Sequence, residues 1–217
     1  MSSDNWYRNT IWDEEIERNF EERLKRSRSS FHKAQYVRIQ ATYLLRTKSK
    51  EYQAVGAELL KRTISDYPNE YLEVTCALEQ LGDYYMKKKD LDEAKYYFEL
   101  ISKYKDYKQN VDVLSNLKLV EIALKKNDVN EFPLAYQHIE NTNIEDLIFN
   151  SDKFYFTYLA ACLSYKTGKT EVAKKYASLS QKLLNNNSPQ FKRHPNIGII
   201  EASKKQLKEL ENILNHK

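Results

Sequence analysis

The 217-residue sequence has few of the residues that form tight turns, with only four glycines and four prolines. Sheet folds with many turns need more of both, so this scarcity argues against them and favours long helices joined by short polar loops. Only two cysteines occur, Cys76 and Cys162. They lie far apart and inside helical patterns, so we expect two buried free thiols and no disulfide.

Long hydrophobic runs are also absent: no stretch approaches the roughly 20 apolar residues that span a bilayer, so we expect no membrane association. The first residues carry neither a basic patch nor an apolar stretch, and a cytoplasmic location is therefore expected. Apolar residues make up 41% and charged residues 30% of the chain, which supports a packed core and excludes a disordered tail. The net charge of +4 predicts no strong attraction to nucleic acid or anionic lipid.

Apolar residues recur at helical spacing along most of the chain, as Ile16, Phe20 and Leu24 illustrate. The pattern predicts an all-α fold of about ten helices. In the last segment, Ile200, Ser203, Leu207, Leu210 and Leu214 form a narrow stripe. This stripe fits a capping helix that covers an exposed apolar face, and it also fits a coiled-coil partner that would form a dimer.

One helical hairpin carries a well-formed signature, and weaker copies follow it. Its first helix holds Leu81-Gly82 and Tyr85, and its second holds Leu91, Ala94 and Phe98. Gly82, Val120 and Ala161 occupy corresponding places in three copies, 38 and 41 residues apart. A single hairpin cannot bury its apolar face, so copies must stack.

Small side chains recur where the paired helices should touch. We expect Gly82, Ala94, Ala161 and Ala173 to be the points of close approach. Tyr85 and Phe98 are expected to fill the space between one hairpin and the next.

These hairpins resemble the tetratricopeptide repeat family over residues 32–186, most clearly from Leu78 to Asp106. The resemblance implies a right-handed solenoid of antiparallel helix hairpins, with an N-terminal segment (1–31) and a C-terminal capping helix (187–217). The copies are more than the usual 34 or so residues apart. A less regular hairpin solenoid and a non-repetitive helical bundle therefore remain alternatives.

The opening segment from Trp6 to Ile16 resembles the start of a group of bacterial tetratricopeptide-like proteins, some of which accompany secreted toxins as immunity partners. The alternative is structural: Trp6 and Trp12 could fasten the N-terminal helix to the first hairpin.

In tetratricopeptide scaffolds the first helix of each hairpin lines a concave groove, and this resemblance implies which residues meet a partner. The set mixes charged residues with tyrosines, which suits a polar protein or peptide surface. It consists of Arg38, Thr42, Arg46, Glu79, Asp83, Lys87, Glu121, Lys125, Tyr155, Tyr158, Tyr165 and Lys166.

No pattern in the sequence predicts catalysis, a cofactor or a metal. The four glycines are isolated, so no phosphate-binding loop is formed, and no His or Cys has a second ligand at metal-binding spacing. Carboxylates interleave with lysines as they do on solvated helix faces. Basic residues are densest between Arg23 and Arg38, but the same helix opens with acidic residues. We read this region as a dipolar surface and expect no nucleic-acid partner.

The sequence therefore predicts a non-catalytic scaffold that binds a protein partner. Its most specific form is a bacterial immunity protein that occludes the active site of a toxin. Alternatives are a peptide-sensing regulatory or adaptor protein, and a helical enzyme or nucleic-acid-binding protein. The partner, the oligomeric state and the binding face stay open.

Overall fold

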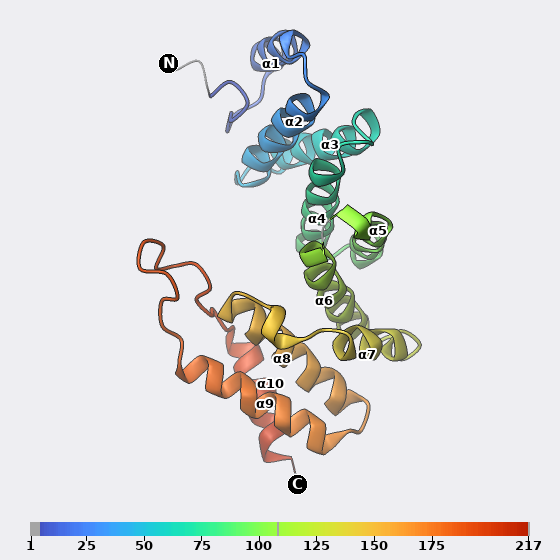
Figure 1. The fold of residues 1–217 in the computed structure, drawn as a ribbon, viewed down its shortest axis with the longest axis vertical. Coiled ribbons are helices and arrows are strands. Elements are labelled where there is room, and N and C mark those ends of the chain that lie inside the picture. Colours follow the sequence, from blue (N-terminus) through green and yellow to red (C-terminus); the bar gives the residue numbers. More distant parts are fainter. Residues whose placement is uncertain (1–4, 108, 217) are drawn as a thin grey trace. The chain divides into compact units, whose positions relative to one another are not determined.

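The computed structural model describes residues 5–107 and 109–216, with residues 105–107 and 109–113 described by their backbone alone (Figure 1). Over these ranges the chain forms ten α-helices and two 3-10 helices and no strand, which confirms the all-α prediction. The elements are α1 (Glu14–Arg26), α2 (Ser30–Leu45), α3 (Lys50–Asp66), α4 (Tyr71–Lys88), α5 (Leu91–Ile101), η1 (Ser102–Tyr107), α6 (Gln109–Lys126), α7 (Phe132–Glu140), η2 (Ile144–Asp146), α8 (Asn150–Lys166), α9 (Thr170–Asn185) and α10 (Lys204–Asn215).

Short polar side chains start several of these helices. The side-chain oxygens of Asp13, Ser29, Ser49, Asp90 and Ser203 each accept a hydrogen bond from the backbone N–H three residues later. Each bond satisfies a donor that the helix itself leaves unpaired. The polar breaks in the sequence thus act directly as helix-start signals.

The chain divides into two compact units, residues 1–112 (unit 1) and 113–217 (unit 2). The expected boundaries after residues 31 and 186 stay predictions. Residues 5–31 pack within unit 1, and α10 packs within unit 2. The four residues that precede this part of the N-terminal segment lie outside the described residues.

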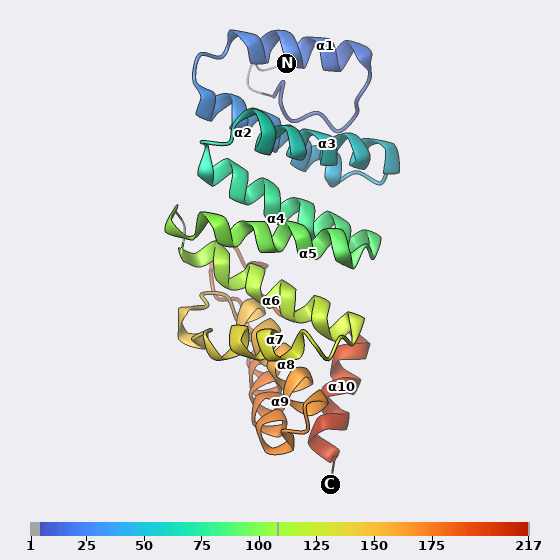
Figure 2. The ribbon, with the colours of Figure 1, turned by 90° about the vertical axis from the view of Figure 1, so that its right-hand side faces the viewer.

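In unit 1, α2 packs against α3, and α4 against α5 (Figure 2). Gly82 is buried on α4, and a Cβ placed there would lie only 2.5 Å from the Phe98 ring on α5. The expected close approach at Gly82 is therefore present. The Phe98 ring fills a contact inside one hairpin, because glycine leaves a space that a large side chain from the paired helix occupies. Its expected place between one hairpin and the next stays a prediction.

Residues 5–13 fasten α1 to α2. The Trp6 ring lies 5.4 Å from the Phe20 ring of α1 and 5.0 Å from the Tyr36 ring of α2, measured between centroids. The Trp12 ring also contacts the Phe20 ring, at a centroid distance of 5.6 Å. The structural explanation is therefore confirmed for Trp6, which contacts both helices, whereas the ring contact of Trp12 is with α1 and its part in fastening the helix stays a prediction.

Unit 2 has two adjoining cores that meet on α8. The first joins α6, α7 and α8 around residues such as Leu117, Phe132 and Leu159. The second joins α8, α9 and α10, where Ala161 and Ala173 are fully buried. The expected close-contact positions on α8 and α9 thus lie in a packed interior.

The C-terminal stripe is only partly as expected. Helix α10 packs on α8 and α9, and buries Leu210 and Ile213. Leu207, expected on the buried face, is 44% exposed, while Ile200 lies before the helix and is buried. Helix α10 starts only after Ser203, so Ile200 is not part of it. The predicted stripe therefore does not lie on a single helix.

Three helix ends repeat the same backbone turn. Lys89, Asn127 and Gly168 follow α4, α6 and α8 with φ angles of 63°, 53° and 75°. In each turn, this residue donates to the carbonyl three positions back, and the next residue donates to the carbonyl five positions back. This is the Schellman arrangement that closes a helix end. The three turns keep the spacings of 38 and 41 residues predicted for the repeat.

Both cysteines are free, as expected, but each is half-buried, and Cys162 borders a cleft. Among the described residues, no helix is long and apolar enough to cross a membrane.

Candidate functional site

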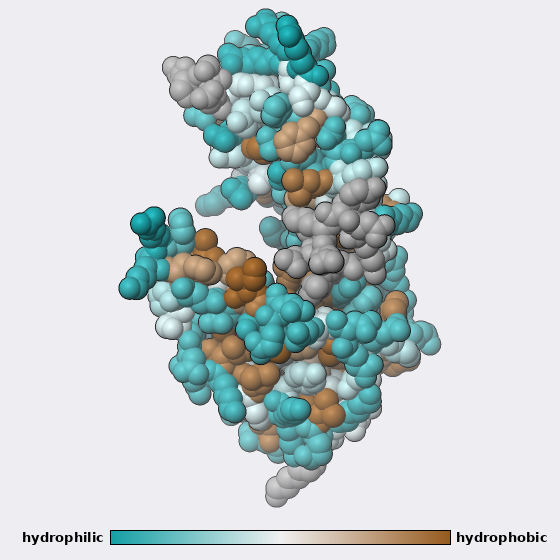
Figure 3. All heavy atoms as spheres, viewed as in Figure 1, coloured by the Kyte–Doolittle hydropathy of each residue, from teal (hydrophilic) through white to brown (hydrophobic). Residues whose placement is uncertain are grey.

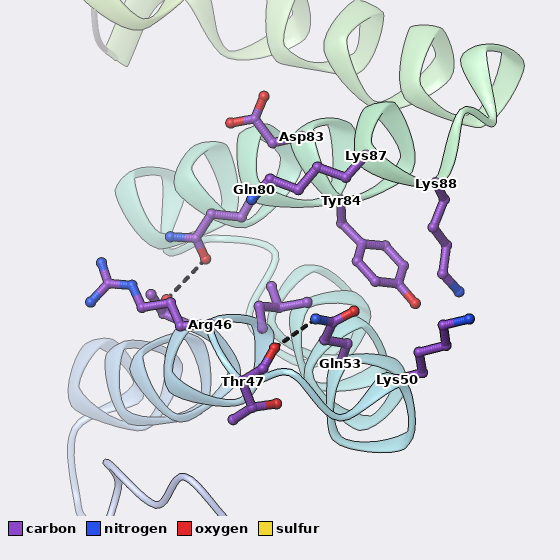
Figure 4. Close-up of a pocket in the computed structure, with 11 residues that line it drawn as sticks. Arg46, Thr47, Lys50, Gln53, Gln80, Asp83, Tyr84, Lys87 and Lys88 are labelled. Atoms are coloured by element: carbon purple, nitrogen blue, oxygen red, sulfur yellow. Dashed lines mark hydrogen bonds between the residues drawn. The ribbon is translucent and has the colours of Figure 1, made fainter. Parts of the chain in front are cut away.

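Unit 1 contains a cleft of about 1090 Å³, referred to below as the unit 1 cleft (Figure 4). The end of α2, the turn into α3 and the last turns of α4 form it. Its lining comprises Thr42, Leu45, Arg46, Thr47, Lys50, Gln53, Gln80, Asp83, Tyr84, Lys87 and Lys88.

Hydrogen bonds hold the walls of the unit 1 cleft. The Thr42 hydroxyl lies 3.1 Å from Gln80 Oε1 on α4 and 2.9 Å from the Arg38 carbonyl on its own helix, and its one proton can be donated to either. Gln53 Nε2 donates to the carbonyl of Thr47 at 2.7 Å and so fixes the turn between α2 and α3. The Lys88 ammonium lies 4.7 Å from the centre of the Tyr84 ring, and a hydrogen bond with the Tyr84 hydroxyl raises the pKa of Lys88.

Positive charge dominates this cleft. Four cations, Arg46, Lys50, Lys87 and Lys88, border it together with a single carboxylate, Asp83. In the part of the chain that the structure describes, no carboxylate forms an ion pair with Arg46, Lys50 or Lys87. The cleft therefore holds a local excess of exposed cations.

Unit 2 contains a second cleft of about 550 Å³, the unit 2 cleft, between α6, α8 and α10. Apolar side chains contribute to its surface together with tyrosines and charged groups. Its lining comprises Glu121, Leu124, Lys125, Tyr155, Tyr158, Leu159, Cys162, Tyr165, Lys166, Ser203, Lys205, Gln206, Glu209, Asn212 and Ile213.

Charges in the unit 2 cleft are mostly neutralised within it. The Tyr155 hydroxyl donates to Glu121 Oε2 at 2.5 Å, and Lys125 Nζ lies 2.8 Å from Glu121 Oε1. Burial alone would raise the pKa of Glu121, but the hydrogen bonds from Lys125 and Tyr155 outweigh it and the pKa is lowered. Glu121 is thus held as a carboxylate beside its two donors.

A tyrosine, a thiol and a carboxylate meet between α8 and α10. The Tyr158 hydroxyl donates to Glu209 Oε2, which joins α8 to α10. Burial, followed by the charge of Glu209, raises the pKa of the Cys162 thiol to about 12. Burial also raises the pKa of Tyr158. Both groups therefore stay protonated at neutral pH, and the thiol is a poor nucleophile.

Ten of the twelve residues predicted to meet a partner lie in these two clefts. Thr42, Arg46, Asp83 and Lys87 line the unit 1 cleft. The unit 2 cleft includes Glu121, Lys125, Tyr155, Tyr158, Tyr165 and Lys166.

The remaining two predicted residues, Arg38 and Glu79, line neither cleft. The Arg38 guanidinium forms an ion pair with Glu73, whose side chain is only 1% exposed. Leaving a buried carboxylate without its partner costs several kcal/mol, so Arg38 stabilises the fold by pairing with Glu73.

Several cleft residues were missed by sequence reasoning. Gln80 precedes Asp83 by three positions and Lys87 by seven, so helical periodicity alone could have selected it in place of Glu79. Lys50 and Glu209 had no such signal, because they come from α3 and α10, outside the helices assigned to the groove.

Within the described residues, no cluster of three or more His, Cys, Asp or Glu side chains could hold a metal ion. The face visible in Figure 3 is mostly hydrophilic, with small hydrophobic groups between. No family model matches the sequence, and neither a curated protein nor a solved structure is significantly similar to it.

Proposed function

We propose that this chain is a non-catalytic scaffold that binds a protein partner through the unit 1 cleft and the unit 2 cleft. The observation that carries the proposal is the gathering of ten predicted contact residues into two clefts rather than across the whole surface. A right-handed stack of tetratricopeptide-like hairpins is the architecture we propose for this binding. The recurring turns after α4, α6 and α8 support it.

The unit 2 cleft has the composition of a protein-contact surface. Tyr155, Tyr158 and Tyr165 offer rings beside Leu124 and Leu159, while charged groups border the same cleft. Tyrosine combines a large apolar area with a hydrogen-bonding tip and few rotatable bonds, which makes it common in protein interfaces.

The most specific form of the proposal is a bacterial, cytoplasmic immunity protein. In this form the partner is a toxin, and the chain neutralises it by covering the toxin's active site. Support for this step comes from the resemblance of the segment from Trp6 to Ile16 to toxin-associated proteins.

Affinity capture from host lysate with the tagged chain tests the binding proposal. We expect one dominant protein to be retained. The variant Lys125→Ala/Tyr165→Ala should retain at least tenfold less of it, with helicity by circular dichroism unchanged. The matched control Tyr96→Ala/Lys175→Ala removes an exposed tyrosine and an exposed lysine outside both clefts, and should bind as the wild type does.

If the cleft variant and its control retained the partner protein equally, the binding site would lie elsewhere. Recovery of nucleic acid or a small molecule instead of a protein would contradict the scaffold. The toxin step has its own test, because a toxic partner should arrest bacterial growth when produced alone and allow growth when this chain is co-produced.

A further inference from the structure

The cations of the unit 1 cleft are placed at two separate ends. Figure 4 shows Arg46 at one end, with the Lys87 side chain extending along α4 as far as Gln80. At the other end, Lys50 and Lys88 converge beside the Tyr84 hydroxyl. The cleft thus offers two separate positive positions.

Helix-end electrostatics explain only part of this charge. Arg46 follows α2, and Lys87 and Lys88 end α4, where cations complement the negative end of the helix dipole. Lys50 is different: it is the first residue of α3, where the positive end of the dipole disfavours a cation. Helix-end electrostatics therefore do not account for Lys50 in this cleft.

Neutral donors in the cleft suit the same kind of ligand. Gln80 Oε1 can accept from the Thr42 hydroxyl, which leaves the Gln80 amide N–H groups to donate outward. Arginine, lysine and amide donors together match carboxylate oxygens.

We propose that the unit 1 cleft binds an acidic segment of a protein partner, with one carboxylate at the Arg46 end and another at the Lys50–Lys88 end. This inference rests on the proposed scaffold function and specifies the chemistry of its partner. Partner carboxylates would pair with Arg46, Lys50 and Lys87, none of which forms an ion pair with a described carboxylate.

A protein segment fits this cleft better than a nucleic acid does. Grooves that hold single-stranded nucleic acid combine cations with aromatic rings on which bases stack. Tyr84 is the only aromatic residue of this lining; it is 8% exposed, and the Lys88 ammonium lies over its ring. No open ring face is therefore offered to a base.

The test uses the full chain and a fluorescein-labelled, acetylated and amidated hexaglutamate peptide, with binding read by fluorescence anisotropy at low salt. The variant Arg46→Gln/Lys50→Gln/Lys87→Gln should bind the peptide about tenfold more weakly than the wild type. The control Lys25→Gln/Arg26→Gln/Arg28→Gln removes the same charge from exposed positions of unit 1 outside the cleft, and should bind within twofold of the wild type.

Three results would overturn the proposal. They are no binding of hexaglutamate, an equal loss in the control, and tighter binding of a hexathymidylate oligonucleotide than of hexaglutamate, the last of which would indicate a nucleic-acid groove. The peptide test can fail while affinity capture still retains a protein partner that depends on a cleft. In that case only this inference would be wrong, and the proposed function would stand.

Discussion

The buried amide of Gln40 pairs with both backbone groups of Asn9. Gln40 Oε1 accepts from the Asn9 backbone N–H at 2.9 Å, and Gln40 Nε2 donates to the Asn9 carbonyl at 2.8 Å. The Asn9 side chain also donates to Gln40 Oε1 at 2.9 Å. Because Gln40 is fully buried on α2, this pairing holds the N-terminal segment at a fixed point of unit 1.

Gln40→Ala should destabilise unit 1 by about 2–3 kcal/mol, since it removes three hydrogen bonds and leaves a backbone N–H without its acceptor. Both tryptophans of the chain, Trp6 and Trp12, contact this region, so their fluorescence during urea unfolding reports on unit 1. Gln53→Ala, which removes one side-chain hydrogen bond, should cost about 1 kcal/mol. Equal losses in the two variants would show that Gln40 does not hold the segment.

Gly82→Ala should also destabilise unit 1, by about 1–3 kcal/mol, because the added methyl group would overlap the Phe98 ring. Adding Phe98→Leu to this variant should recover part of the loss, since a smaller side chain makes room for the methyl group. A double-mutant cycle from urea unfolding measures the coupling. Additive effects would contradict direct contact between these two positions.

Acid should weaken unit 2 through Glu121. Its pKa in the folded state is lower than the ordinary 4.5, so its contribution to stability is present above that value and is lost as the pH falls through the folded pKa. In a carboxyl-carbon NMR titration we expect a Glu121 midpoint below 4.5, which Tyr155→Phe should move upward. A midpoint at or above 4.5 in the wild type would contradict the hydrogen-bonded arrangement.

Cys162 should react slowly with iodoacetamide. With a pKa of about 12, its thiolate fraction at pH 8 is far below that of an ordinary thiol, so alkylation should be roughly a hundredfold slower or more. In a Cys76→Ser background, Glu209→Gln should accelerate the reaction, because it removes a neighbouring negative charge. Glu211→Gln, at an exposed position of the same helix, is the control. An ordinary rate in the wild type would contradict the burial of this thiol.

The sequence pattern was sufficient to identify the helices because polar breaks and apolar periodicity act locally. The end of α3 before Tyr67-Pro68 follows from the restriction that proline places on the residue before it. The C-terminal stripe was misread because Ser203 starts a helix there, and periodicity alone does not locate a cap. Local signals thus predicted where the helices lie better than which side of each helix is buried.

Sequence spacing predicted the cleft residues that lie together on one helix. It missed those that tertiary packing brings in from another helix. Asp83 and Lys87 share a face of α4, which sequence spacing reveals. Lys50 and Glu209 enter their clefts from α3 and α10, whose tertiary positions depend on packing across the unit. Arg38 was assigned to the groove because its pairing with Glu73, 35 residues away, leaves no local trace.

The turns after α4, α6 and α8 are closed by main-chain bonds alone, although a lysine, an asparagine and a glycine occupy the left-handed position. What each turn demands is a positive φ angle, which glycine adopts at little cost and other residues adopt with strain. A side chain at Gly168 is therefore disfavoured by the backbone itself, although open space surrounds the position, whereas Lys89 and Asn127 already carry that strain in turns closed by the same main-chain bonds.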